Sequence, residues 1–189
     1  MTEKRVVYFE QRGTTNTQRV LELAARRARE LRIRSIVVAT TGGTVGMMAP
    51  DALSGFDVVV VTHSTGFAEP GRQEVPSEVI DEIRRKGAHV LTATHVFGGV
   101  GRAVRNRFKT YQTEEIVAQT LRLMGQGTKV AVEITLMAAD AGLISPHYEV
   151  IACGGTGRGL DTALVLKPAH AQSLFDLEIR EVICKPRVP

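Results

Sequence analysis

The chain has 189 residues, of which 43% are hydrophobic and 23% are charged, and its formal net charge is +4. A chain of this length buries roughly 70% of its unfolded surface, so we expect one domain over residues 1–189 with a single large core. No apolar run approaches the ~20 residues needed to cross a bilayer, and the apolar run near the N-terminus is too short for a signal peptide. These features exclude a membrane-spanning protein and predict a cytoplasmic one.

Cysteine and histidine usage indicates neither a disulfide framework nor a metal site. The two cysteines, Cys153 and Cys184, form no paired-thiol motif and are expected to be small buried hydrophobes. The five histidines lack the spacing that places metal ligands on one helix.

Basic residues gather in two places, within residues 1–34 and between residues 102 and 109. Such clusters suit an anionic ligand or a nucleic acid, although charge runs more often form a solvated helix face. Aromatic residues make up only 5% of the chain and tryptophan is absent, so surfaces on which bases could stack are scarce. Nucleic acid is therefore not expected as a partner.

In the first half of the chain, strands and helices alternate, which is typical of a parallel sheet covered on both faces. Continuous apolar runs predict the two central strands, because strands buried on both sides need no polar face. The predicted elements are a strand at residues 5–9, a helix from about residue 17 to 31 with its apolar stripe at helical spacing, strands at 35–39 and 57–61, a helix at 76–86 and a strand at 88–92.

The second half begins with residues 94–112, which predict a long glycine-containing loop with one helical turn near residues 102–105. A loop of this length is typical of a lid or of a segment that a ligand orders. A helix is expected at 113–124. Residues 129–144 match both an alternating strand and a helical stripe. We expect a mostly buried helix there, because sixteen residues are long for a strand.

The C-terminal part predicts strands at residues 149–152 and 162–166. About nine residues separate them, too few for a helical crossover, so they should pair antiparallel as a hairpin. Residues 177–183 alternate like a half-exposed edge strand. The elements together predict an α/β fold with a mixed, mostly parallel sheet.

The first candidate ligand loop is Thr40-Thr41-Gly42-Gly43-Thr44, between a strand and a predicted helix. Glycine permits close backbone approach, and a helix N-terminus offers free amides that favour a phosphate. A tight turn with hydroxyl caps would explain the same residues. Open α/β sheets bind ligands at the carboxyl ends of their strands. Thr62 and His63, which end the next strand, are therefore expected at the same edge.

A second candidate loop contains Gly154, Gly155, Thr156, Gly157 and Arg158. It has the glycine frame of a P-loop but lacks the Lys-Ser/Thr pair, and no helix follows it, so nucleotide triphosphate hydrolysis is not predicted. A loop that wraps an anion or a flat ring is favoured over a flexible hairpin.

Three further features are weaker indications. The run from Gly98 to Arg102 departs from the dinucleotide fingerprint and suits a mobile lid equally well. His63 and His95 have the chemistry of acid–base groups, but a lone histidine at a strand end more often packs or forms hydrogen bonds. Glu133 and Asp140 are expected to bond nearby amides or hydroxyls.

Residues 36–44 resemble the activator-phosphate loop in the C-terminal domain of pyruvate kinase, where a strand, a Thr- and Gly-rich turn and a helix follow one another. The whole chain resembles the stand-alone archaeal and bacterial relatives of that domain. The matching stretches are residues 16–19, 37–44, 61–67, 125–134, 137–144, 154–168 and 183–186.

This resemblance implies a three-layer α/β/α fold of the pyruvate kinase C-terminal type, with a helix at residues 129–144. Members of the family have been seen with flavin mononucleotide (FMN), so the resemblance implies a flavin phosphate at residues 40–44. Pyruvate kinase has an arginine where this chain has Thr44, so a sugar bisphosphate activator is not expected. Kinase activity is not expected either, because no part of the sequence resembles the barrel domain that performs it.

The leading hypothesis is a protein that binds FMN or another phosphate-bearing small molecule, with no assigned reaction. The alternative is a non-catalytic regulatory module that binds a phosphometabolite, and a nucleic-acid binder ranks last. The sequence leaves the substrate, any redox partner and the oligomeric state open, a homo-oligomer included.

Overall fold

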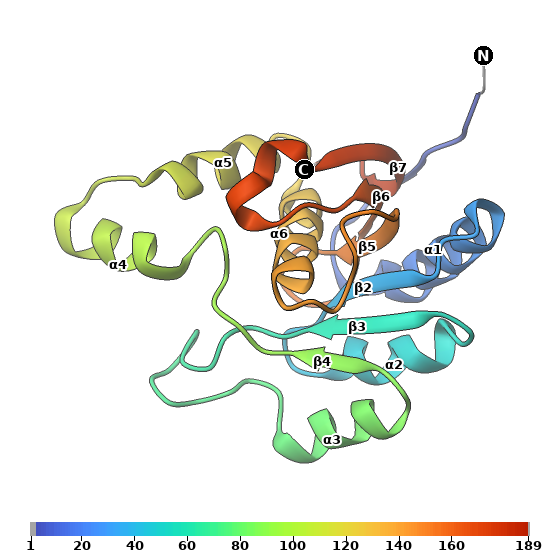
Figure 1. The fold of residues 1–189 in the computed structure, drawn as a ribbon, viewed down its shortest axis with the longest axis horizontal. Helices are drawn as coiled ribbons and strands as arrows, with labels where there is room; N and C mark the ends of the chain where they lie inside the picture. The colour runs from blue at the N-terminus through green and yellow to red at the C-terminus, as the bar shows by residue number, and fades with distance from the viewer. Residues whose placement is uncertain (1–2, 189) are drawn as a thin grey trace.

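A seven-stranded sheet forms the centre of the computed structural model, which describes residues 3–188 (Figure 1). The strand order is β1-β7-β6-β5-β2-β3-β4. Strands β5, β2, β3 and β4 run parallel, and β6 is antiparallel to both β5 and β7. The mixed, mostly parallel sheet and its antiparallel C-terminal hairpin are therefore confirmed. The strands are β1 (Val7–Phe9), β2 (Ser35–Ala39), β3 (Asp57–Val61), β4 (His89–Leu91), β5 (Val150–Gly154), β6 (Thr162–Lys167) and β7 (Glu178–Pro186).

Helices cover both faces of the sheet and complete the three-layer α/β/α fold. The first three helices pack on one face and α6 packs on the other, with α5 outside α6. The helices are α1 (Thr17–Leu31), α2 (Thr44–Ala52), α3 (Ser77–Arg85), α4 (Gly99–Phe108), α5 (Thr113–Arg122) and α6 (Gln126–Asp140), with short 3-10 turns η1 (Thr14–Asn16) and η2 (Ala171–Asp176). None of the helices within residues 3–188 has the length and apolarity to span a membrane.

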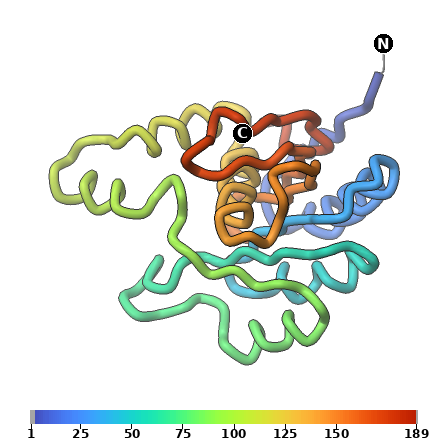
Figure 2. The backbone as a smooth tube through the Cα atoms, viewed as in Figure 1, coloured from blue at the N-terminus to red at the C-terminus, as the bar shows by residue number. Residues whose placement is uncertain are grey.

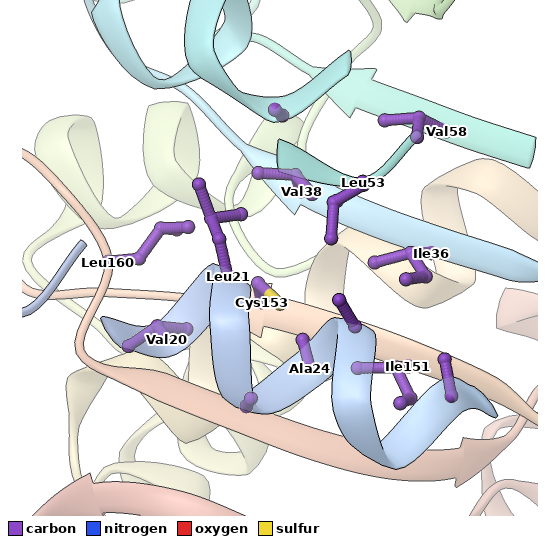
Figure 3. Packing of buried hydrophobic residues seen from close by; sticks show 14 of the residues in the cluster. Val20, Leu21, Ala24, Ile36, Val38, Leu53, Val58, Ile151, Cys153 and Leu160 are labelled. Carbon is purple, nitrogen blue, oxygen red and sulfur yellow. The ribbon is translucent and has the colours of Figure 1, made fainter. Parts of the chain in front are cut away.

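Alternation along β2 divides its side chains between two cores. Ile36 and Val38 face α1 and α2, whereas Val37 faces α6. Figure 3 shows the first core, in which Val20 and Leu21 of α1 lie against the sheet. Both sides of the strand are buried, which is why its sequence is apolar without a polar face.

Helix α6 confirms the helix expected at residues 129–144, although it begins earlier and ends at Asp140. Nearly all of its side chains are buried, because it lies between the sheet and α5. A helix without a polar face has a weak 3.6-residue signal, which explains the ambiguity of its sequence pattern.

The loop expected at residues 94–112 is wrong for most of its length, because α4 occupies ten of these residues. Glycine disfavours a helix by about 1 kcal/mol relative to alanine, so the local pattern indicated a loop. The helix lies close to α5, and the backbone of the buried Gly101 faces the end of the Glu114 side chain. The α4–α5 pair extends away from the sheet (Figure 2).

Among the described residues, the part of β7 up to residue 183 pairs with β6 alone, so this stretch is the half-exposed edge expected for residues 177–183. Strand β1, the last strand of the sheet order, pairs in parallel with residues 184–186, a pairing that the sequence did not predict. The pairing joins residues more than 170 positions apart, from Val7 with Cys184 to Phe9 with Pro186. Cys153 and Cys184 are both buried free thiols, as expected.

Because α6 lies very close to the β5–β6 hairpin, adding one methyl group at this contact should strongly destabilise the fold. In Gly127→Ala the new Cβ would lie 2.6 Å from Oδ1 of Asp161, with no space to accept it. Overpacking of this kind costs about 1–3 kcal/mol, which urea unfolding would measure. Gly42→Ala is the control, because no atom lies within 4 Å of its Cβ. Equal stability of the two variants would contradict the prediction.

Candidate functional site

A cavity of about 240 Å³ opens where the carboxyl ends of β2 and β3 meet α6 and the β5–β6 loop. Of the sequence-predicted site residues, the structure brings one half to its lining: Thr40, Thr41, Thr62, His63, Gly155 and Gly157. The other predicted residues lie outside the lining: Gly42, Gly43, Thr44, Gly154, Thr156 and Arg158.

The loop at residues 40–44 leaves backbone donors free. Within residues 3–188, the amides of residues 41–45 donate no hydrogen bond, whereas the Thr40 amide donates to the Val61 carbonyl. The buried Thr40 hydroxyl accepts a hydrogen bond from the Gly46 amide at 3.2 Å, which fixes the start of α2. Gly43 has a φ of +94°, and a Cβ there would lie 2.8 Å from Cγ1 of Val79, so this turn requires glycine.

The glycine-rich loop between β5 and β6 is held in place rather than flexible. The fully buried Asp161 carboxylate accepts hydrogen bonds from the Gly13 amide at 3.0 Å and the Thr156 amide at 3.1 Å. The Thr41 hydroxyl donates to the Gly157 carbonyl at 3.3 Å, which joins the two predicted loops directly.

A buried ion pair between Lys129 and Glu133 forms the α6 wall of the cavity. Oε1 of Glu133 accepts a hydrogen bond from the Phe97 amide at 3.2 Å, and Oε2 lies 3.5 Å from Nδ1 of His95. Burial raises the pKa of Glu133, but His95 and Lys129 outweigh it and lower that pKa to about 2. Burial lowers the pKa of Lys129, with Glu133 opposing the shift. The amide bond expected for Glu133 is thus present.

Asp140, the other acidic residue considered on this helix, lies away from the cavity. Its carboxylate accepts the Ala171 amide at 3.1 Å and lies 3.2 Å from Nδ1 of His170. It bonds a nearby amide, as expected.

Three rings also line the cavity, those of His63, Phe67 and His95. Ring centroids of His63 and Phe67 are 4.1 Å apart, and those of Phe67 and His95 are 5.1 Å apart. The Arg102 guanidinium lies over the Phe67 ring at 4.6 Å. His63, which was expected at this edge, and His95 therefore lie side by side in the candidate site.

Three cations and one carboxylate line the cavity, namely Arg102, Arg122, Lys129 and Glu133. Glu133 neutralises Lys129, and within residues 3–188 neither arginine forms an ion pair. The cavity therefore carries excess positive charge. Its lining contains no metal-binding cluster, since no group of three or more suitable ligands occurs among the described residues.

Sequence reasoning did not assign Arg122 or Lys129 to the site. One sequence feature could have pointed to Lys129: it forms an i, i+4 pair of opposite charges with Glu133 within an otherwise apolar helix. Charges in a buried helix are rare unless they are paired or functional.

Comparison with known proteins identifies a matching family. The family model described as pyruvate kinase, alpha/beta domain, matches residues 18–166, from α1 through almost all of β6. Two solved structures of pyruvate kinase from Cryptosporidium parvum are similar to the chain. One is 14% identical with a TM-score of 0.43 over 81% of this chain, and the other is 12% identical with a TM-score of 0.39 over 79%. The chain spans 23% and 21% of their respective lengths.

The ion pair generates a prediction for stability and its pH dependence. Glu133→Gln leaves the Lys129 ammonium buried without a counter-charge, which costs about 3–5 kcal/mol at neutral pH. Because folding lowers the pKa of Glu133, its contribution is full above about 4.5 and is lost as the pH falls towards about 2. Urea unfolding at neutral pH and at about pH 3 would therefore show a smaller difference between wild type and variant at the lower pH.

The double variant Lys129→Met/Glu133→Leu is the control, because it removes both charges and should recover most of the lost stability. A Glu133→Gln variant as stable as wild type at neutral pH would contradict the prediction.

Proposed function

The chain belongs to the pyruvate kinase alpha/beta domain family, and we propose that it binds a phosphate-bearing small molecule in the cavity at the carboxyl edge of its sheet. The observation that carries this proposal is the set of free backbone amides at residues 41–45. They open α2, so the positive end of the helix dipole adds to their attraction for a dianion. Of these five residues Thr41 lines the cavity, so the phosphate would bind where this loop meets the cavity.

Side-chain charge supports the same ligand. Arg102 and Arg122 line the cavity, and no carboxylate within residues 3–188 pairs with either. A phosphate would supply the missing negative charge, and guanidinium groups bind phosphate oxygens with strong charge-assisted hydrogen bonds.

The basic residues of α1 favour a small ligand over nucleic acid. Arg19 pairs with Glu22, and Arg27 pairs with both Glu30 and Glu181. These cations are already paired within the fold, and the exposed Arg19 fits the solvated helix face that charge runs usually form.

FMN fits the site only in part. Its phosphate matches the free amides, but the cavity of about 240 Å³ is smaller than the ~300–1,000 Å³ typical of cofactor sites. The geometry therefore favours a small phosphometabolite, the alternative from the sequence. FMN remains a second candidate because of the phosphate subsite.

Inorganic phosphate provides the direct test of the subsite. At a hundred times its dissociation constant it should raise stability by about 2.7 kcal/mol, seen as a higher melting temperature. Thr44→Glu places a negative charge on the first residue of α2, at an exposed position where an acid suits the helix dipole. The variant should fold normally but bind phosphate about tenfold more weakly, a loss of about 1.4 kcal/mol.

Thr44→Gln is the matched control, with a similar side chain and no charge. It should keep the phosphate-dependent rise in melting temperature. If phosphate, sugar phosphates and nucleotides all leave the melting temperature of the wild type unchanged, the proposed function is wrong.

A separate experiment distinguishes FMN from small phosphometabolites. We expect glycerol 3-phosphate and ribose 5-phosphate to stabilise the protein more than FMN at equal concentration, because they fit within the cavity. If the purified protein shows the visible absorption band of a bound flavin, or if FMN stabilises it most, then FMN is the better ligand and the expected order is wrong.

A further inference from the structure

The two histidines of the cavity differ in which ring nitrogens are occupied. Nε2 of His95 lies 3.4 Å from the Ser64 amide that donates to it, and its Nδ1 lies 3.5 Å from Oε2 of Glu133. Nδ1 of His63 lies 2.6 Å from Oε2 of Glu74, whereas within residues 3–188 its Nε2 has no hydrogen-bond partner. His63 alone therefore has a free ring nitrogen to offer a ligand.

Glu74 and the surrounding loop hold His63 in one orientation. A carboxylate at Nδ1 sets the tautomer and orients the ring. The His63 carbonyl accepts a hydrogen bond from Nε2 of Gln73 at 2.9 Å, and the ring packs on Phe67. A histidine oriented in this way is suited to proton transfer at Nε2.

Strand register places His63 beside the proposed phosphate subsite. Ala39 of β2 pairs with Val61 of β3, and Thr41 and His63 each follow two residues later. Neighbouring strands lie about 4.8 Å apart, and both residues line the cavity. A phosphate at the Thr41 end of these free amides would therefore lie close to the imidazole.

From this juxtaposition we propose that the chain hydrolyses a small phosphate monoester in this cavity, with His63 as the general acid. The inference rests on the proposed function, because the ester's phosphate must bind at residues 41–45. The oxygen of a water molecule bonds to phosphorus while the bond from phosphorus to the ester oxygen breaks, leaving its electron pair on that oxygen. His63 Nε2 donates its proton to this oxygen, and a proton from the attacking water returns to His63 through solvent. The products are an alcohol and inorganic phosphate.

The remaining groups of the cavity suit this reaction. Phosphoryl transfer proceeds through a loose transition state in which catalysis is mainly positioning and charge stabilisation. Arg102 and Arg122 can supply positive charge to the phosphoryl oxygens, as can the free amides. Glu74 acts as a positioning residue, because it contacts His63 and lies outside the cavity lining.

Release of inorganic phosphate from a panel of esters tests the proposal. The panel is glycerol 3-phosphate, ribose 5-phosphate, fructose 1,6-bisphosphate and FMN, and wild type should hydrolyse at least one of them. His63→Gln should lower kcat by about 10²- to 10⁴-fold, the usual contribution of a general acid. Glu74→Gln should lower kcat and leave KM unchanged, and an unchanged melting temperature shows that the loss does not come from a smaller folded fraction.

The matched control is His170→Gln. His170 also pairs with a carboxylate, that of Asp140, but it is absent from the cavity lining, so its removal should leave kcat unchanged. Melting temperature with and without inorganic phosphate shows that each variant folds and binds.

Failure of the two proposals can be told apart. If phosphate stabilises the wild type but no ester is hydrolysed, hydrolysis is wrong and ligand binding stands. If neither stabilisation nor hydrolysis occurs, both are wrong. If His63→Gln hydrolyses the ester at the wild-type rate, His63 is not the general acid.

Discussion

The close approach of α6 to the β5–β6 hairpin is the constraint on which the rest of the site depends. Gly127 on the helix and Gly154 on the strand leave no room for a side chain, and a Cβ on Gly154 would lie 2.9 Å from the Ala131 amide. This contact places Lys129 and Glu133, two turns or less along the helix, over the ends of β2 and β3. A larger residue at either glycine would move the cavity wall away from the sheet edge.

A buried carboxylate then joins this hairpin to the start of the chain. Asp161 has no solvent exposure, and it bonds the Gly13 amide, the Thr156 amide and the Thr162 hydroxyl. A charge without solvent is stable only when hydrogen bonds replace the lost water. The carboxylate therefore holds the glycine-rich loop in one conformation, from which the Gly157 carbonyl reaches the Thr41 hydroxyl.

The polar groups of the cavity fall into two sets. Lys129 is paired with Glu133, and His95 is engaged at both ring nitrogens. Within residues 3–188, Arg102 and Arg122 form no ion pair and Nε2 of His63 has no hydrogen-bond partner. The first set holds the wall of the cavity together, and the second is the set on which the proposed function and hydrolysis rest.

The sequence by itself determined the elements whose signals are local. The bounds of β2 and β3 were predicted because both faces of each strand are buried, so the apolar run ends where the strand ends. The loop at residues 40–44 was predicted from its own glycines and threonines. Tertiary structure decided what depends on distant partners. Helix α4 forms despite three glycines in and beside it and packs on α5, and residues 184–186 of β7 gain a second neighbour because β1 returns to pair with them. Arg122 and Lys129 reach the cavity from more than 80 positions beyond residue 41, a distance over which sequence spacing carries no geometric information.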